Sequence, residues 1–242
     1  MRNKGTYFLL ISCFFISVNS IAQIKKDTLK ILFVGNSYTY FESMPQMVSQ
    51  ISGNTKTKLI TRKSTVGGAK LSQHWRGVRG LKTKEIIQKG TFDIVVLQDH
   101  SMMALNAPDS LRKYAKLFSD FIKKHNVTPY FYLTWARKST PKRQAEITKV
   151  YTEIANTNNA VLVPVGEAWA LAQKSRPSIQ LYHSDGSHPS KLGAYLTASV
   201  FVAVLSKEVP KSDGENDKNP ISIATSELLF SKKIATSFIL KK

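Results

Sequence analysis

The stretch LKILFVGNSYT, residues 29–39, runs four apolar residues directly into a Gly-Asn-Ser turn. A short apolar run that ends at turn residues is typical of a buried strand in a parallel sheet. Gly35 and Ser37 would then lie at the carboxyl end of that strand, where such sheets gather their functional groups. The turn offers either backbone amides for an anion or the hydroxyl of Ser37, and the rest of the chain decides between them.

Strand-like and helix-like segments alternate along the chain. Besides residues 30–34, strands are expected at residues 57–65, 91–98, 128–135 and 160–165. Helices are expected at residues 42–53, 108–125, 141–159, 166–175 and 189–206. This alternation predicts an α/β fold with a mostly parallel sheet covered by helices on both faces.

The length of 242 residues suits one large domain, and 42% hydrophobic residues are enough to build a sizeable core. We expect a single domain over residues 23–242, with its core at 29–206. The remaining segment, 207–242, reads as an exposed polar loop followed by a final helix.

The N-terminus has the pattern of a signal peptide over residues 1–22. A basic start, MRNKG, precedes the apolar run TYFLLISCFFISV, and Ser20 and Ala22 fit the small residues of a cleavage site. Cleavage after Ala22 predicts a secreted or periplasmic protein without stable membrane insertion. An uncleaved membrane anchor and a lipoprotein that carries its lipid on Cys13 are the alternatives.

Charge and cysteine content narrow the functional classes. A net charge of +19 suits a partner such as an acidic polysaccharide or an anionic envelope surface, and the alternative is an ordinary solvated basic surface. The Lys and Arg residues are scattered without a nucleic-acid-binding motif, so no nucleic acid partner is expected. Cys13 is the only cysteine, and its removal with the signal would exclude cysteine catalysis. The histidines are dispersed, so neither a metal nor another cofactor is expected.

The sequence around Ser37 favours the hydroxyl over a phosphate cradle. Gly35 stands alone, whereas dinucleotide and P-loop motifs need further glycines at fixed spacing. A serine nucleophile needs a histidine base and often a carboxylate that orients it. The segment HSDGSHPSKLG, residues 183–193, offers both as Asp185 and His188. The alternative is structural, since Asp185 can also organise a turn before the following helix.

Three blocks in this order resemble the SGNH (GDSL-like) hydrolase family. They are VGNSYT around Ser37, VGGA around Gly68, and DGSHPSKLGAYL from Asp185. The resemblance implies a three-layer α/β/α sandwich with a flavodoxin-like sheet. It also implies Ser37 as nucleophile, His188 as base, Asp185 as the orienting carboxylate, and the amides of Ser37 and Gly68 in an oxyanion hole.

The third block departs from the family pattern. The family has Gly-x-Asn-Asp there, and the asparagine amide donates to the oxyanion, whereas this chain reads VLQDHS. Gln98 can donate from a similar carboxamide, as in branches of the family that carry Gln in this block. Ser101 is a second candidate for that place, and a non-catalytic relative stays open.

The resemblance implies an esterase that removes small acyl groups, above all O-acetyl, from carbohydrates, and the signal peptide would make it secreted. Arg137 could pair with a carboxylate of an acidic glycan, or it could be an ordinary surface residue. A glycan-binding relative without activity and an O-acyltransferase with the same triad are the alternatives. Further side chains lie where they could contact the substrate. These are Asn36, His74, Trp75, His100, Ser101 and Arg137.

Overall fold

The computed structural model describes residues 27–208 and 223–239. The predicted signal peptide, its cleavage site and most of the predicted polar loop therefore lie outside the described residues. Within the two described ranges, no helix has both the length and the apolar character that are needed to cross a membrane.

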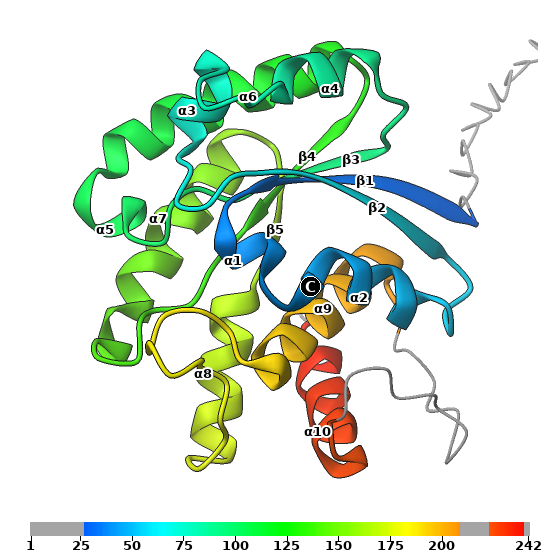
Figure 1. The fold of residues 1–242 in the computed structure, drawn as a ribbon, viewed down its shortest axis with the longest axis vertical. Coiled ribbons are helices and arrows are strands. Elements are labelled where there is room, and N and C mark those ends of the chain that lie inside the picture. The colour runs from blue at the N-terminus through cyan, green and yellow to red at the C-terminus, as the bar shows by residue number, and fades with distance from the viewer. Residues whose placement is uncertain (1–26, 209–222, 240–242) are drawn as a thin grey trace, which may run out of the picture.

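The described chain forms one five-stranded sheet in the order β2-β1-β3-β4-β5, and every strand pair is parallel (Figure 1). The strands are β1 (Thr28–Gly35), β2 (Lys58–Thr65), β3 (Ile94–Leu97), β4 (Thr128–Tyr132) and β5 (Val161–Val163). This is the flavodoxin-like order, in which the chain changes direction across the sheet between β1 and β3. Ser37 follows β1 and thus lies at this switch point.

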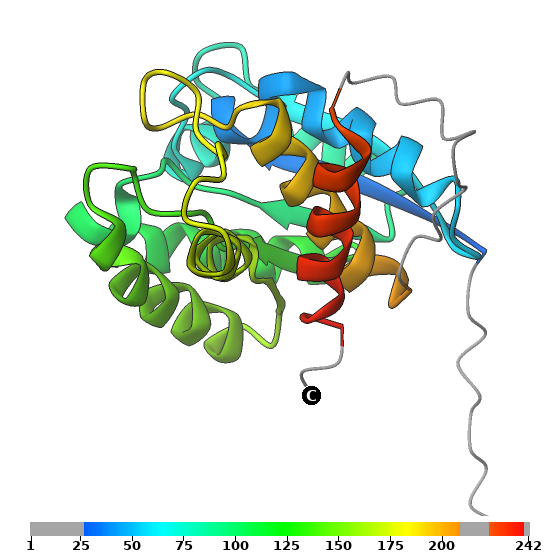
Figure 2. The ribbon, with the colours of Figure 1, turned by 90° about the horizontal axis from the view of Figure 1, so that it is seen from below.

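Helices cover both faces of the sheet, which confirms the predicted three-layer α/β/α sandwich (Figures 1 and 2). One face carries α2 (Met44–Ser52), α8 (Val165–Ser175), α9 (Lys191–Ser206) and α10 (Thr225–Thr236). The other carries α3 (Leu71–Arg76), α4 (Thr83–Lys89), α5 (Met103–Asn106), α6 (Pro108–Lys124) and α7 (Gln144–Thr157), which the short helix η2 (Pro141–Arg143) precedes.

Strand β1 supplies both cores because successive side chains of a strand point to opposite faces. Ile31 and Phe33 pack into the core under α9, and Leu32 and Val34 pack into the core under α6. All four are fully buried, which explains why β1 is a continuous apolar run in the sequence. Helix α9 is buried along most of its length because α2, α8 and α10 all pack against it.

The segment after β1 differs from the expected helix at residues 42–53. A short helix α1 (Ser37–Tyr40) begins directly after the strand, because the Asn36 side chain caps it by accepting a hydrogen bond from the Tyr38 amide. The turn η1 (Phe41–Ser43) follows, and Glu42 and Ser43 have positive φ angles of 50° and 54°. This left-handed pair breaks the helix before α2 begins.

Helices α3, α4 and α5 were missed in the sequence because they are too short for a helical repeat of apolar residues. Strands β3 and β4 end at Leu97 and Tyr132, earlier than the patterns predicted. The residues after them continue as extended chain along the same edge of the sheet, where the candidate site lies.

Candidate active site

Ser37, His188 and Asp185 form a continuous hydrogen-bonded series. Ser37 is the first residue of α1, and the other two lie in the loop that precedes α9 and passes beside α1 (Figures 1 and 2). Ser37 Oγ lies 2.8 Å from His188 Nε2, and His188 Nδ1 lies 2.5 Å from Asp185 Oδ2. The structure therefore brings Ser37 to a loop that begins 148 positions later, at Asp185. The three side chains have the geometry of a Ser-His-Asp triad.

Asp185 is held in its ionised form by the loop that carries it. Its Oδ1 accepts hydrogen bonds from the backbone amides of Ser187 and His188, at 2.8 and 2.9 Å. Partial desolvation raises the pKa of Asp185. The hydrogen bonds from the His188 ring and from these two amides lower it by more, so that the pKa falls to about 2. The carboxylate is thus charged at any neutral pH, and it fixes the imidazole with Nδ1 as the protonated nitrogen.

Ser187, between the two loop members of the triad, is held by two aromatic side chains. Trp135 Nε1 donates to the Ser187 carbonyl at 2.9 Å, and the Tyr38 hydroxyl lies 2.7 Å from Ser187 Oγ. The loop also closes on itself, because the His183 amide donates to the His188 carbonyl at 2.8 Å. The base is therefore positioned by the core and by its own loop.

Stacked rings support this arrangement. Tyr38 stacks on Trp135 at a centroid distance of 4.8 Å, and Trp135 stacks on Trp169 at 3.8 Å. On the other side of the triad, Phe41 stacks on the His188 ring at 4.8 Å with an interplanar angle of 24°. Sequence analysis missed Tyr38, Trp135 and Phe41, since no local motif shows which rings reach the histidine.

Asn36 connects the turn after β1 to the turn after β2. Its Nδ2 donates to the Ala69 carbonyl at 2.9 Å, while its Oδ1 accepts the Tyr38 amide. The side chain is buried, so it positions the two turns and is not free to bind substrate as the sequence suggested. It places Gly68, the residue before Ala69, beside the Ser37 turn.

Two backbone amides remain available at this junction. Gly68 has a φ of +65° in a turn that the Ala69 amide closes by donating to Val66, and Ser37 is the first residue of α1. Among the residues that the structure describes, neither the Ser37 amide nor the Gly68 amide donates a hydrogen bond. These are the two amides that the sequence assigned to an oxyanion hole.

The structure engages Gln98, which the sequence suggested as an oxyanion donor, in holding the nucleophile turn. Its side chain is fully buried, and its Oε1 accepts hydrogen bonds from the Asn36 amide and from Thr39 Oγ1, both at 2.9 Å. Its Nε2 donates to the Asp99 carbonyl. Both ends of the Gln98 carboxamide are thus engaged within the protein, and Gln98 holds the nucleophile turn. Gly35 must be glycine here, because a Cβ would collide with Gln98 Oε1 and Thr39 Oγ1.

His74 also differs from its expected role in the substrate pocket. It is fully buried, with Nε2 at 3.0 Å from the Gly35 carbonyl and Nδ1 at 2.7 Å from Thr83 Oγ1. Because a carbonyl only accepts, Nε2 carries the proton and the Thr83 hydroxyl donates to Nδ1. Burial lowers the pKa of His74 to about 4, although the bond to Gly35 opposes the shift. His74 is therefore a neutral anchor for the end of β1.

Trp75 likewise packs away from the triad. Its ring makes edge contacts with Phe118 and Phe121 of α6, and Lys84 lies over it at 4.7 Å. Ser101, the second candidate for the third block, is buried at the start of the segment after β3. The half-buried His100 and Arg137 lie at the carboxyl ends of β3 and β4, as the sequence predicted.

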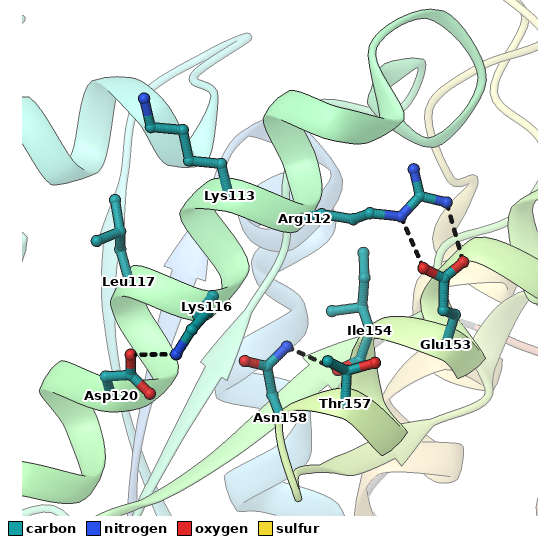
Figure 3. Close-up of a pocket in the computed structure, with 9 residues that line it drawn as sticks. All are labelled: Arg112, Lys113, Lys116, Leu117, Asp120, Glu153, Ile154, Thr157 and Asn158. Atoms are coloured by element: carbon teal, nitrogen blue, oxygen red, sulfur yellow. Dashed lines mark hydrogen bonds and ion pairs between the residues drawn. The ribbon is translucent and has the colours of Figure 1, made fainter.

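The described residues contain no group of three or more His, Cys, Asp or Glu side chains that could hold a metal ion. A hollow of about 380 Å³ lies between α6 and α7 (Figure 3). Ion pairs between Arg112 and Glu153 and between Lys116 and Asp120 occupy its rim. None of the triad residues lines it, so it is separate from the candidate site.

Comparison with solved structures identifies the architecture. A protein from Slackia heliotrinireducens, assigned provisionally as an SGNH hydrolase, matches with a TM-score of 0.63 and 24% identity, over 74% of this chain and 98% of its own. The chain has the SGNH-hydrolase fold. No protein-family model and no curated protein matches the sequence.

Two more distant structures share the SGNH fold with this chain. The psychrotrophic esterase EstA from Pseudoalteromonas matches with a TM-score of 0.57 and 14% identity, over 75% of this chain and 98% of its own. An acetyl xylan esterase from Geobacillus stearothermophilus matches with a TM-score of 0.56 and 13% identity, over 76% and 97%. The family resemblance seen in the sequence blocks is thus confirmed at the level of the fold.

The buried neutral state of His74 predicts a pH-dependent stability. An unfolded histidine takes up a proton near pH 6.5, whereas the folded His74 resists protonation down to about pH 4. Its contribution to stability is therefore complete above about pH 6.5 and is lost as the pH falls towards 4, by on the order of 3 kcal/mol. Urea unfolding of the wild type and of His74→Gln across this range should show a weaker acid dependence in the variant.

Asp99 changes the stability in the opposite direction as the pH falls. Burial raises its pKa to about 6, although the hydrogen bonds from two backbone amides lower it, so the folded state binds a proton more readily than the unfolded state does. Comparing the variant with the wild type separates the two groups, because both proteins retain Asp99. Parallel loss of stability in the two proteins would show that His74 does not resist protonation.

The position of Gln98 predicts a loss of stability when its polar end is removed. Gln98→Met keeps the length of the side chain but leaves the Asn36 amide and the Thr39 hydroxyl buried without an acceptor. The free energy of unfolding should fall by about 1–3 kcal/mol, measured by urea denaturation. Gln88→Met, at an exposed position of α4, is the matched control. A Gln98→Met protein with unchanged stability and lost activity would instead restore the oxyanion role.

Proposed function

We propose that the protein is a secreted serine esterase that removes small acyl groups, chiefly O-acetyl, from carbohydrate substrates. The observation that carries this proposal is the hydrogen-bonded series from Ser37 through His188 to Asp185. The SGNH fold supports it, since ester hydrolases are among the structures that share the fold. The complete series also argues against a relative that has lost its catalytic residues.

The geometry accounts for each proton in acyl transfer. Ser37 Oγ attacks the ester carbonyl as its proton passes to His188 Nε2, which then protonates the leaving alcohol. In the second half-reaction, His188 takes a proton from water, and the water oxygen attacks the acyl-enzyme. His188 then returns that proton to Ser37 Oγ, which releases the acid and restores Ser37. Asp185 stays ionised throughout and stabilises the imidazolium in each half-reaction.

The developing oxyanion would be held by the amides of Ser37 and Gly68. Both are backbone donors, and the Asn36–Ala69 hydrogen bond holds their two turns together. Backbone donors that are fixed before the reaction need no reorganisation when charge develops on the carbonyl oxygen. Gln98 Oε1 accepts a hydrogen bond from the Asn36 amide and so fixes the turn that carries Ser37.

The setting of the triad suits a polar substrate with a small acyl group. The side chains of Asp185 and His188 are 42% and 28% exposed, so the triad lies at the surface. A bulky carbohydrate can approach such a site, whereas a long acyl chain needs an apolar channel. A signal peptide would deliver the enzyme to extracellular or periplasmic glycans, and one structure with the same fold is an acetyl xylan esterase.

Removal of the nucleophile tests the proposal. Ser37→Ala should lower kcat for acetate release from acetylated polysaccharides and from p-nitrophenyl acetate by at least about 10⁴-fold, because binding and the oxyanion donors alone cannot form the acyl-enzyme. A serine-directed phosphonate should label the wild type and leave this variant unlabelled.

Ser178→Ala, at an exposed serine outside the triad loop, is the control and should keep full activity. Equal turnover by Ser37→Ala and the wild type would rule out Ser37 as nucleophile. A purified wild type that neither releases acetate nor reacts with the phosphonate would contradict the esterase proposal as a whole.

The stacking of Phe41 on His188 predicts a second effect on catalysis. When His188 takes the proton of Ser37, the face of the Phe41 ring stabilises the positive imidazolium by a cation–π interaction. Phe41→Leu should therefore lower kcat by about three- to thirtyfold. Phe41→Tyr keeps the ring and should stay within about threefold of the wild type. Equal losses in both variants would indicate that the ring only fills space.

A further inference from the structure

Three positively charged or basic side chains gather at the edge of the sheet that carries the triad. Lys70 follows the turn after β2, His100 follows β3, and Arg137 follows β4. Burial lowers the pKa of His100, and the positive charges of Arg137 and Lys70 lower it further. All three residues follow the carboxyl ends of strands of one parallel sheet, which lie at the same edge.

Arg137 has no partner for its guanidinium among the residues that the structure describes. Its Nε is buried and makes no hydrogen bond, and no ion pair joins it to a carboxylate there. Other arginines of the described chain, such as Arg112 and Arg143, do form such pairs. The donors of this half-buried guanidinium are therefore available to an acceptor on a bound molecule.

Both cations are tied to the triad through the backbone. The Lys138 amide, next to Arg137, donates to the Gly186 carbonyl at 2.9 Å, and Gly186 follows Asp185. On the other side, Ala69 precedes Lys70 and accepts the hydrogen bond from Asn36, which precedes Ser37. Arg137 and Lys70 thus border the two segments that carry the nucleophile and the base.

Asp99, which follows β3 at the same edge, is engaged by backbone amides. It is almost fully buried, and its Oδ1 accepts the amides of Leu71 and His100 at 2.9 and 2.7 Å. The Lys70 side chain is exposed, and no ion pair joins it to Asp99. Asp99 thus has its Oδ1 occupied by backbone donors, and Lys70 keeps its ammonium group in solvent.

We propose that Arg137 and Lys70 form an anion subsite, and that the substrate carries a carboxylate near the ester that Ser37 attacks. The planar guanidinium of Arg137 matches a carboxylate with two parallel hydrogen bonds, and Lys70 adds a second positive charge. The substrate class is then an acyl ester on an acidic sugar, such as a uronic acid unit. This inference rests on the proposed esterase function and narrows its substrate.

A pair of esters that differ only in the carboxylate tests the subsite. The probes are an acetylated methyl glucuronoside and the matching acetylated methyl glucoside, and the measured quantity is the ratio of their kcat/KM values. The wild type should prefer the acidic ester by about tenfold or more, because a hydrogen bond between two charged groups stabilises a complex more than a hydrogen bond between neutral groups does. Arg137→Gln should lower this ratio by about tenfold, and Arg137→Lys should lower it less.

Arg79→Gln is the matched control, because it removes one exposed positive charge from the turn between α3 and α4. It should leave the ratio within about twofold of the wild type. An equal ratio in the wild type and Arg137→Gln would overturn the subsite, and so would an equal loss of the preference in Arg79→Gln.

Binding of the two esters to the Ser37→Ala variant tests the anion subsite independently of esterase activity. Titration calorimetry should show tighter binding of the acidic ester than of the neutral ester, and the added Arg137→Gln change should remove the difference. Preferential binding without turnover by the wild type would retain the subsite and contradict the esterase. Turnover with no preference for the acidic ester would retain the esterase and contradict the subsite.

Discussion

The turn after β1 is the constraint on which the site depends, and hydrogen bonds tie it to three other segments. His74 of α3 donates to the Gly35 carbonyl, and Gln98 after β3 accepts the Asn36 amide. Asn36 in turn reaches the Ala69 carbonyl after β2. Each of these polar groups is buried, so losing one leaves a partner unsatisfied. This makes the position of Ser37 a property of the sheet edge as a whole.

The base is positioned by a different kind of contact. The loop with Asp185 and His188 is long and partly exposed, and it is fastened by the Trp135 indole, the Tyr38 hydroxyl and the stacked rings behind them. Trp135 follows β4, so the same strand that leads to Arg137 also holds the triad loop. Catalytic geometry and the charge beside it are therefore linked through one segment of chain.

Much of this arrangement could be predicted from local pattern. The alternation of apolar runs and helical segments predicted the parallel three-layer fold, and the Gly-Asn-Ser turn with the later Asp-x-x-His segment predicted which residues meet. The short helices α3 to α5 and the break at Glu42 and Ser43 could not be predicted, because they depend on contacts between distant segments. The predicted signal peptide stays a prediction, since it lies outside the described residues.

The sequence by itself determined which residue types stand at the strand ends, because strand ends and turns are marked by local composition. Only the tertiary structure decided which of those side chains face the substrate and which face the core. Gln98, His74 and Asn36 look like site residues in the sequence, yet all three are buried and hold the nucleophile turn. The physical reason is that burial at a strand end depends on the neighbours across the sheet, which no local segment contains.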